Sequence, residues 1–132
     1  MREIKYRGKS IETGEWVYGY YVYTHDRHRI IYEDYEGFYC EEEVDPETVG
    51  QCIGLKDKNG TEIYEGDIVI AWSAGVKAIC EVKWGQGRAG FFLYRKPNIA
   101  WNLSGGGKDY NEENVEVIGN IYEHLHLLET ED

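Results

Sequence analysis

The sequence predicts an all-β protein, in which an N-terminal antiparallel sheet packs on a small, SH3-like, partly open β-barrel with little helix. Three observations lead to this fold class. The chain of 132 residues contains 12 Tyr, 4 Trp and 3 Phe, and aromatic residues suit the half-buried surface of a pleated sheet. Its 16 Gly and 2 Pro indicate many tight turns. No segment shows the apolar periodicity of a helix of about 10 residues or more.

The first strands are predicted before Pro46. Residues 3–8 alternate weakly and can begin a sheet, and residues 14–26 (GEWVYGYYVYTHD) form a long strand with aromatic residues on both faces. Such a strand is either covered on both sides or keeps one face for a partner. Residues 28–34 and 37–42 follow as a hairpin, with its turn near Glu36-Gly37.

Pro46, followed by Gly50 and Gly54, interrupts the strand pattern and marks a connection. We therefore predict an N-terminal β lobe over residues 1–50 and a C-terminal barrel lobe over residues 51–132, together forming one compact unit.

Glycine turns separate the strands of the second lobe. Asn59-Gly60 accepts the positive φ angles of a two-residue hairpin turn, and Gly66-Asp67 leads into an apolar strand. Further strands are predicted in the segments KAICEVKWG, GFFLYRK and NVEVIGN. The segment from residue 121 to residue 129 fits either a fraying strand or a single helical turn. In this interpretation the stretch from residue 54 to residue 72 builds the fold, although Lys56, Asp57 and Lys58 could form an exposed tip for recognition.

The charge distribution bears on the partners. The 25 acidic residues outnumber the 14 basic ones, giving a formal net charge of −11. Because nonspecific nucleic-acid binding depends on cationic side chains, we expect no direct nucleic-acid binding by the chain as a whole. The acids gather between residues 33 and 47 and after Lys108. Solvated loops explain these clusters more simply than a binding surface, and the sequence leaves both alternatives open.

The sequence gives little support to catalysis or metal binding. No Cys-x-x-Cys pair occurs, and neither histidine pair has a third ligand at a suitable spacing, so we expect free, mostly buried thiols and surface imidazoles. The residues concerned are Cys40, Cys52, Cys80, His25, His28, His124 and His126. The glycine-rich segment 104–109 lacks the spacing of a phosphate-binding loop. We predict no catalytic, metal-binding or cofactor-binding residue, no cofactor and no enzymatic activity.

Four aromatic residues of the second half, together with one arginine, are the candidate interaction surface. Small barrels recognise peptides or stacked bases with aromatic side chains in a groove. The more ordinary alternative is that these aromatic residues fill the core. The candidates are Trp72, Trp84, Arg88, Tyr94 and Trp101.

Several segments resemble the YopX family of phage and prophage proteins. The similarity is carried by REIKYRG, GEWVYGYYV, the central VDPETVGQCIGLKDKNGTEIYEGDIV and the terminal VIGNIYEHLHLL. It spans nearly the whole chain, although residues 73–110 carry little of the pattern. The resemblance implies a mostly β fold and a phage or prophage of a low-GC Gram-positive bacterium. It carries over no catalytic or binding residue.

These observations leave three hypotheses of function. The first is a phage-encoded accessory protein that binds a host or phage protein through a strand edge or an aromatic surface. The second is an acidic decoy that occupies a DNA-binding protein, and the third is a nucleic-acid-binding barrel. The N-terminus lacks a signal peptide's apolar core and no apolar run reaches about 18 residues, so we expect no membrane association and a location in the bacterial host cytoplasm. Edge strands also allow a homo-oligomer.

Overall fold

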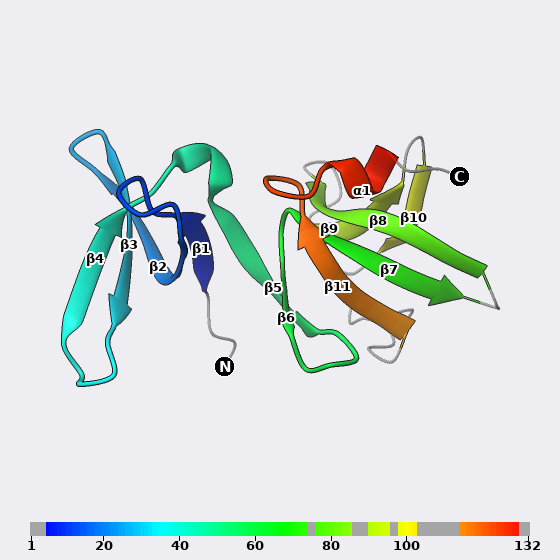
Figure 1. The fold of residues 1–132 in the computed structure, drawn as a ribbon, viewed down its shortest axis with the longest axis horizontal. Helices are drawn as coiled ribbons and strands as arrows, with labels where there is room; N and C mark the ends of the chain where they lie inside the picture. Colours follow the sequence, from blue (N-terminus) through cyan, green and yellow to red (C-terminus); the bar gives the residue numbers. More distant parts are fainter. Residues whose placement is uncertain (1–4, 74–75, 86–89, 96–97, 103–113, 130–132) are drawn as a thin grey trace. The chain divides into compact units, whose positions relative to one another are not determined.

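The protein is described by a computed structural model, in which residues 5–73, 76–85, 90–95, 98–102 and 114–129 are placed (Figure 1). Strands make up 64% of it, in two antiparallel sheets, so the predicted fold class is confirmed. The second sheet is open rather than closed, as the prediction of a partly open barrel allows. The elements, in chain order, are β1 (Tyr6–Lys9), β2 (Trp16–Thr24), β3 (Arg27–Glu33), β4 (Tyr39–Glu43), the 3₁₀ helix η1 (Pro46–Thr48), β5 (Gly50–Lys56), β6 (Glu62–Tyr64), β7 (Asp67–Ser73), β8 (Val76–Gly85), β9 (Gly90–Arg95), β10 (Asn98–Asn102), β11 (Val115–Asn120) and α1 (His126–Glu129).

The chain divides into two compact units, unit 1 over residues 1–52 and unit 2 over residues 53–132. The sequence placed the boundary between residues 50 and 51, and the chain passes from one unit to the other within β5. Unit 1 has the strand order β4-β3-β2-β1-β5. In unit 2, the second half of β5 neighbours β6, and a five-stranded sheet has the order β10-β9-β8-β7-β11.

Unit 1 is built around the long strand β2. Its two faces differ: Val17 packs with Ile30 and Val44 in a small core, whereas Tyr18 and Tyr20 of the opposite face are exposed. Gly19 allows the close approach of β3, because a Cβ atom at this position would lie 2.2 Å from the carbonyl oxygen of Ile31.

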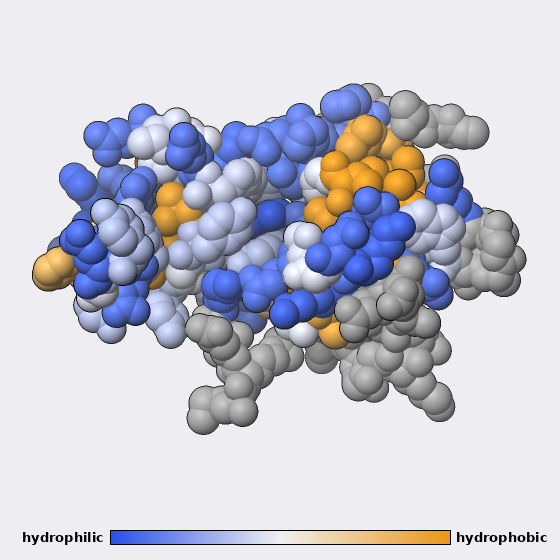
Figure 2. Space-filling view, turned by 60° about the horizontal axis from the view of Figure 1, so that its bottom comes forward, coloured by the Kyte–Doolittle hydropathy of each residue, from blue (hydrophilic) through white to orange (hydrophobic). Residues whose placement is uncertain are grey.

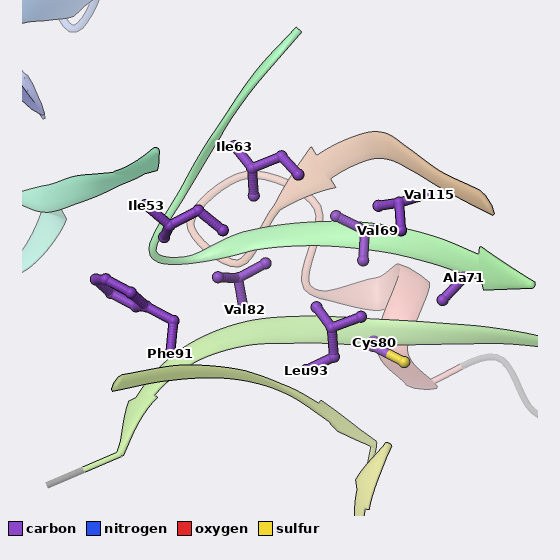
Figure 3. Packing of buried hydrophobic residues seen from close by; sticks show 9 residues of the cluster. All are labelled: Ile53, Ile63, Val69, Ala71, Cys80, Val82, Phe91, Leu93 and Val115. Carbon is purple, nitrogen blue, oxygen red and sulfur yellow. The ribbon is translucent and has the colours of Figure 1, made fainter. Parts of the chain in front are cut away.

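The core of unit 2 lies between the five-stranded sheet and the β5–β6 hairpin. Ile53 and Ile63 of the hairpin point toward Val69, Val82 and other residues of the sheet (Figure 3). Each of these side chains is almost fully removed from water, and burying one such aliphatic side chain contributes about 1.5–3 kcal/mol. A turn at Asn59-Gly60 joins the two hairpin strands, as predicted, but it is not the two-residue type. The connection spans residues 57–61, and of the predicted pair only Gly60 has a positive φ, +82°.

Asp57 ties the β5–β6 hairpin to β11. Its Oδ1 atom accepts hydrogen bonds from the backbone N–H groups of Asn59 and Thr61, each at 2.9 Å. Its Oδ2 atom accepts the N–H of Val117 at 2.9 Å, sixty residues further along the chain. The side chain is 1% exposed, so the expectation of an exposed tip that includes Asp57 is wrong. The carboxylate is needed inside, where it satisfies backbone donors that the turn leaves unpaired.

Two further buried polar residues hold turns at the same end of the second sheet, where Asp67 at the start of β7 is opposite Asn120 at the end of β11. The Oδ2 atom of Asp67 accepts the buried N–H of Tyr64 at 2.7 Å, and the Oδ1 atom of Asn120 accepts those of Tyr122 and Glu123, each at 3.0 Å. The stretch from residue 54 to residue 72 therefore builds the fold, and its two buried carboxylates, Asp57 and Asp67, bind backbone N–H groups.

After β11 the chain makes one helical turn, α1, so the helical alternative applies to this segment. No helix in the described part of the chain is long and apolar enough to cross a membrane. Cys52 and Cys80 are buried and Cys40 is partly buried, and all three are free thiols, as predicted.

Candidate interaction surfaces

The sequence candidates Trp72 and Tyr94 lie on the face of the five-stranded sheet that is turned away from the unit 2 core. In the strand register Trp72 is opposite Lys77, and Tyr94 is opposite Glu81. Both rings are partly buried, and each lies under a lysine. The Nζ atom of Lys58 is 4.8 Å from the centre of the Trp72 ring, and that of Lys83 is 4.8 Å from the centre of the Tyr94 ring.

Acidic side chains offset these cations. The Nζ atom of Lys58 also lies 3.6 Å from a carboxylate oxygen of Glu116. Burial raises the pKa of Glu81, and the neighbouring charge of Lys83 lowers it in part. Because Lys58 and Lys83 are engaged in this way, the surface offers less positive charge to a phosphate backbone than the sequence suggests.

The described structure does not bring the other sequence candidates together with Trp72 and Tyr94. Trp84 lies on the opposite face, 46% exposed, with its ring edge-to-face against Phe91 of the core at 5.0 Å. Trp101 is part of β10, whose backbone is described, while its side chain is not, and Arg88 falls outside the described residues. The proposed grouping of all five residues into one surface therefore stays a prediction.

A space-filling view adds one observation on unit 2. Figure 2 shows hydrophobic residues gathered in one area of its surface, with hydrophilic residues around them. An apolar area with a polar surround is typical of an interaction site, although protein surfaces commonly expose some apolar area.

Among the side chains that the structure describes, the most exposed aromatic ones lie in unit 1, which the sequence reasoning did not single out. Tyr35, Phe38 and Tyr39 are 96%, 66% and 77% exposed, and we call these three residues the aromatic tip. They stand at the turn between β3 and β4. The available signal was the pattern YEGFY, a predicted glycine turn flanked by aromatic residues rather than by polar ones.

The backbone of the aromatic tip is held by Asp34. Its Oδ1 atom accepts hydrogen bonds from the N–H groups of Glu36 and Phe38, each at 2.9 Å. The N–H of Asp34 donates to the carbonyl oxygen of Phe38 at 2.9 Å, and the N–H of Gly37 donates to the carbonyl oxygen of Asp34 at 3.0 Å. The exposed rings are thus displayed on an ordered turn, with little backbone freedom left to lose on binding.

The hairpin that carries the aromatic tip is acidic. Two of its carboxylates face arginines of β3, since Arg29 is 3.2 Å from Glu41 and Arg27 is 3.7 Å from Glu43. No such arginine pair is found among the described contacts of the remaining acids, which are Glu33, Asp34, Glu36 and Glu42.

The opposite face of this hairpin carries a cluster around His28. The His28 ring stacks on Tyr23 with centroids 4.4 Å apart, and its Nδ1 atom shares a hydrogen bond with the hydroxyl of Tyr21. Burial raises the pKa of Tyr21, with smaller contributions from Tyr23 and Tyr6. His28 is therefore engaged with tyrosines, and among the described residues no group of three or more potential metal ligands is found.

A family model and a solved structure relate the chain to known proteins. The sequence model of the family described as YopX protein matches residues 5–129. A solved structure, the crystal structure of protein EF1440 from Enterococcus faecalis, is 23% identical with a TM-score of 0.58, covering 97% of this chain and 99% of that one. At this identity the likeness concerns the fold alone. No curated protein matches the chain.

Proposed function

The chain belongs to the YopX family, and from this membership we propose that it is a phage- or prophage-encoded accessory protein that acts in the host cytoplasm. Its role is to bind a host or phage protein, without catalysis and without a cofactor. The resemblance of its motifs to phage and prophage proteins supports the setting. The described architecture supports the binding role, since the motif residues Asp57, Asp67 and Asn120 serve the backbone rather than a reactive site.

The observation that carries this proposal is the aromatic tip. Three large, exposed rings come from five consecutive residues at a turn that Asp34 holds in place. Leaving such rings exposed forgoes about 1.5–3 kcal/mol each that burial would give. Aromatic side chains dominate the binding energy of protein interfaces, because they bury a large area at a low cost in side-chain entropy. A partner that covers the tip would recover this energy.

The face of β2 that is turned away from the unit 1 core also exposes aromatic rings. Tyr18 and Tyr20 are 46% and 57% exposed, and the guanidinium of Arg7 lies 4.6 Å from the centre of the neighbouring Trp16 ring. Tyrosines mixed with charges form adaptable contacts to proteins. In unit 2, Trp72 and Tyr94 on one face of the sheet and Trp84 on the other remain alternative regions for binding, and the experiment below compares the aromatic tip with the Trp84 face.

The test is affinity capture from a host lysate with the full chain as bait, with and without nuclease and at low and high salt. Bait variants are Tyr35→Ser/Phe38→Ser for the aromatic tip and Trp84→Ser for unit 2, with Ile11→Ser as the control for loss of an exposed apolar residue, since Ile11 is 60% exposed. We expect a nuclease-resistant protein that the tip variant loses and the control keeps.

Other outcomes select other functions. A basic, DNA-binding partner that is lost at high salt from every bait would favour an acidic decoy, because screened charges would then carry the binding. Nucleic acid as the sole captured molecule would favour the nucleic-acid-binding barrel. Loss of the partner with Trp84→Ser alone would move the interaction surface to unit 2.

A further inference from the structure

β4 is an edge strand of its sheet. In the described sheet its one neighbouring strand is β3. The N–H of Val44 donates to the carbonyl oxygen of His28, and that of Asp34 donates to Phe38, each at 2.9 Å. Residues of a strand alternate in the direction of their backbone groups. The N–H and C=O groups of the odd-numbered residues of β4, Tyr39 and Glu41, are therefore directed away from β3.

The far end of this edge is already covered, which limits the free stretch. The carbonyl oxygen of Glu43 accepts the N–H of Ile11 at 2.9 Å, and Val44 forms a bridge with Ser10. The free stretch thus runs from Glu41 back to Tyr39 and ends at the aromatic tip. An incoming strand there would meet backbone donors and acceptors first and the exposed rings of Phe38 and Tyr39 next.

Native proteins commonly use charged side chains to protect an edge strand from pairing. The acids of β4 can protect this edge against a second copy of the same chain. If a second copy of this chain paired antiparallel at this edge in the register centred on Glu41, the two Glu41 side chains would stand opposite each other. Like charges directly opposite each other destabilise a strand pair. The acids therefore disfavour self-pairing, whereas they favour a strand with basic side chains.

The register determines which residue types the added strand should carry. In the pairing with β3, Tyr39, Glu41 and Glu43 all lie on one face of the sheet. On this face Glu41 already lies 3.2 Å from Arg29, so a cation opposite Glu41 would share its carboxylate with Arg29. A cation next to Tyr39 could lie over its ring. The matching partner segment carries Lys or Arg at every second position.

We infer that the free edge of β4 binds an extended segment of a partner protein that carries Lys or Arg at alternate positions, adding it as a strand beside Tyr39–Glu41. The partner is a protein, because the contacts are main-chain hydrogen bonds that peptides supply. This inference rests on the proposed protein-binding function and names the class of segment that the same hairpin recognises.

The test uses the full chain, labelled with ¹⁵N, and a capped peptide of about seven residues that alternates lysine with threonine, the usual length of a strand. Two control peptides replace lysine by glutamate or carry N-methyl groups that remove the pairing N–H groups. We expect shifts confined to the amides of the β3–β4 hairpin, and slower hydrogen exchange at Tyr39 and Glu41 on binding. Both controls should bind about tenfold more weakly or not at all.

A charge exchange makes the test specific. Glu41 is on the surface, with its side chain 60% exposed, so Glu41→Lys should fold and should then prefer the glutamate peptide over the lysine peptide. Shifts outside the hairpin, equal binding of the N-methylated peptide, or no binding of the lysine peptide at about 1 mM would overturn the inference. Such a failure leaves the proposed function testable, because capture that depends on Tyr35 and Phe38 does not require strand addition.

Discussion

Replacing Asp57 should destabilise unit 2 more than any other single change at a polar residue of the hairpin turn. Its carboxylate accepts three backbone N–H groups, those of Asn59, Thr61 and Val117, each at 2.9 Å. Hydrogen bonds to a charged acceptor contribute about 1.5–3 kcal/mol each, so simple addition gives about 4.5–9 kcal/mol. Because the three bonds share one side chain, they are not additive. We expect about 4 kcal/mol for Asp57→Ala.

Asp57→Asn distinguishes the hydrogen bonds within the turn from the hydrogen bond to β11. The amide keeps one acceptor oxygen, which can still serve the N–H groups of Asn59 and Thr61. Its NH₂ group then faces the N–H of Val117, so the bond to β11 is lost and two donors oppose each other. We expect a loss of about 2 kcal/mol, half of that for the alanine variant.

The assay is urea unfolding followed by tryptophan fluorescence and circular dichroism. Asp34→Asn is the matched control, because Asp34 also accepts two turn N–H groups but does so at an exposed site, where the change should cost about 0.5 kcal/mol. A typical domain is stable by about 5–15 kcal/mol, so Asp57→Ala should shift the midpoint strongly. Equal and small effects of Asp57→Asn and Asp34→Asn would refute the assignment of Asp57 as a structural centre.

Three further predictions concern stability. Glu81→Gln should stabilise the protein at neutral pH. Burial raises the folded-state pKa of the Glu81 carboxyl, so the folded state binds more protons than the unfolded state. The free energy of unfolding of the wild type therefore falls as the pH rises through this raised pKa. The difference between variant and wild type in urea unfolding should vanish below the carboxyl's unfolded-state pKa, and a pH-independent difference would contradict this reasoning. Gly19→Ala should cost about 3 kcal/mol, because the new Cβ would lie 2.2 Å from the carbonyl oxygen of Ile31, and an unchanged thermal midpoint would show that β2 and β3 are not this close. His25→Asn should stabilise by about 0.5 kcal/mol, because His25 has a φ of 53° and asparagine tolerates this region better, and a lower thermal midpoint would show that the imidazole has another role.

Strand pattern and turn chemistry were enough to predict most of the fold. The alternation in GEWVYGYYV indicated two faces of β2, and the structure places Val17 in the core and Tyr18 in water. Asn59-Gly60 indicated a turn because glycine accepts a φ of +82° at low cost. Strand alternation and turn residues depend on the local sequence, so the folded chain keeps the structure that they predict.

Long-range contacts were beyond the sequence argument. Asp57 was expected at an exposed tip because a charged residue beside Asn-Gly usually faces water. The burial of Asp57 depends on its hydrogen bond with the N–H of Val117, sixty residues away, and the local sequence pattern does not predict this contact. The candidate surface shows the same limit, since Trp72 and Trp84 are close in sequence but lie on opposite faces of the sheet. The aromatic tip was overlooked because exposure of a ring, unlike strand alternation, depends on what the rest of the chain covers.

The central claim, that the aromatic tip binds a protein, is tested most directly by site-specific photocrosslinking in host cells. A photoreactive phenylalanine analogue replaces Tyr35, which is 96% exposed, in one strain and Trp84, which is 46% exposed, in another. We expect one discrete crosslinked protein from position 35 and none of the same mass from position 84. No crosslink from position 35, together with a discrete product from position 84, would contradict the claim and would place the binding surface in unit 2.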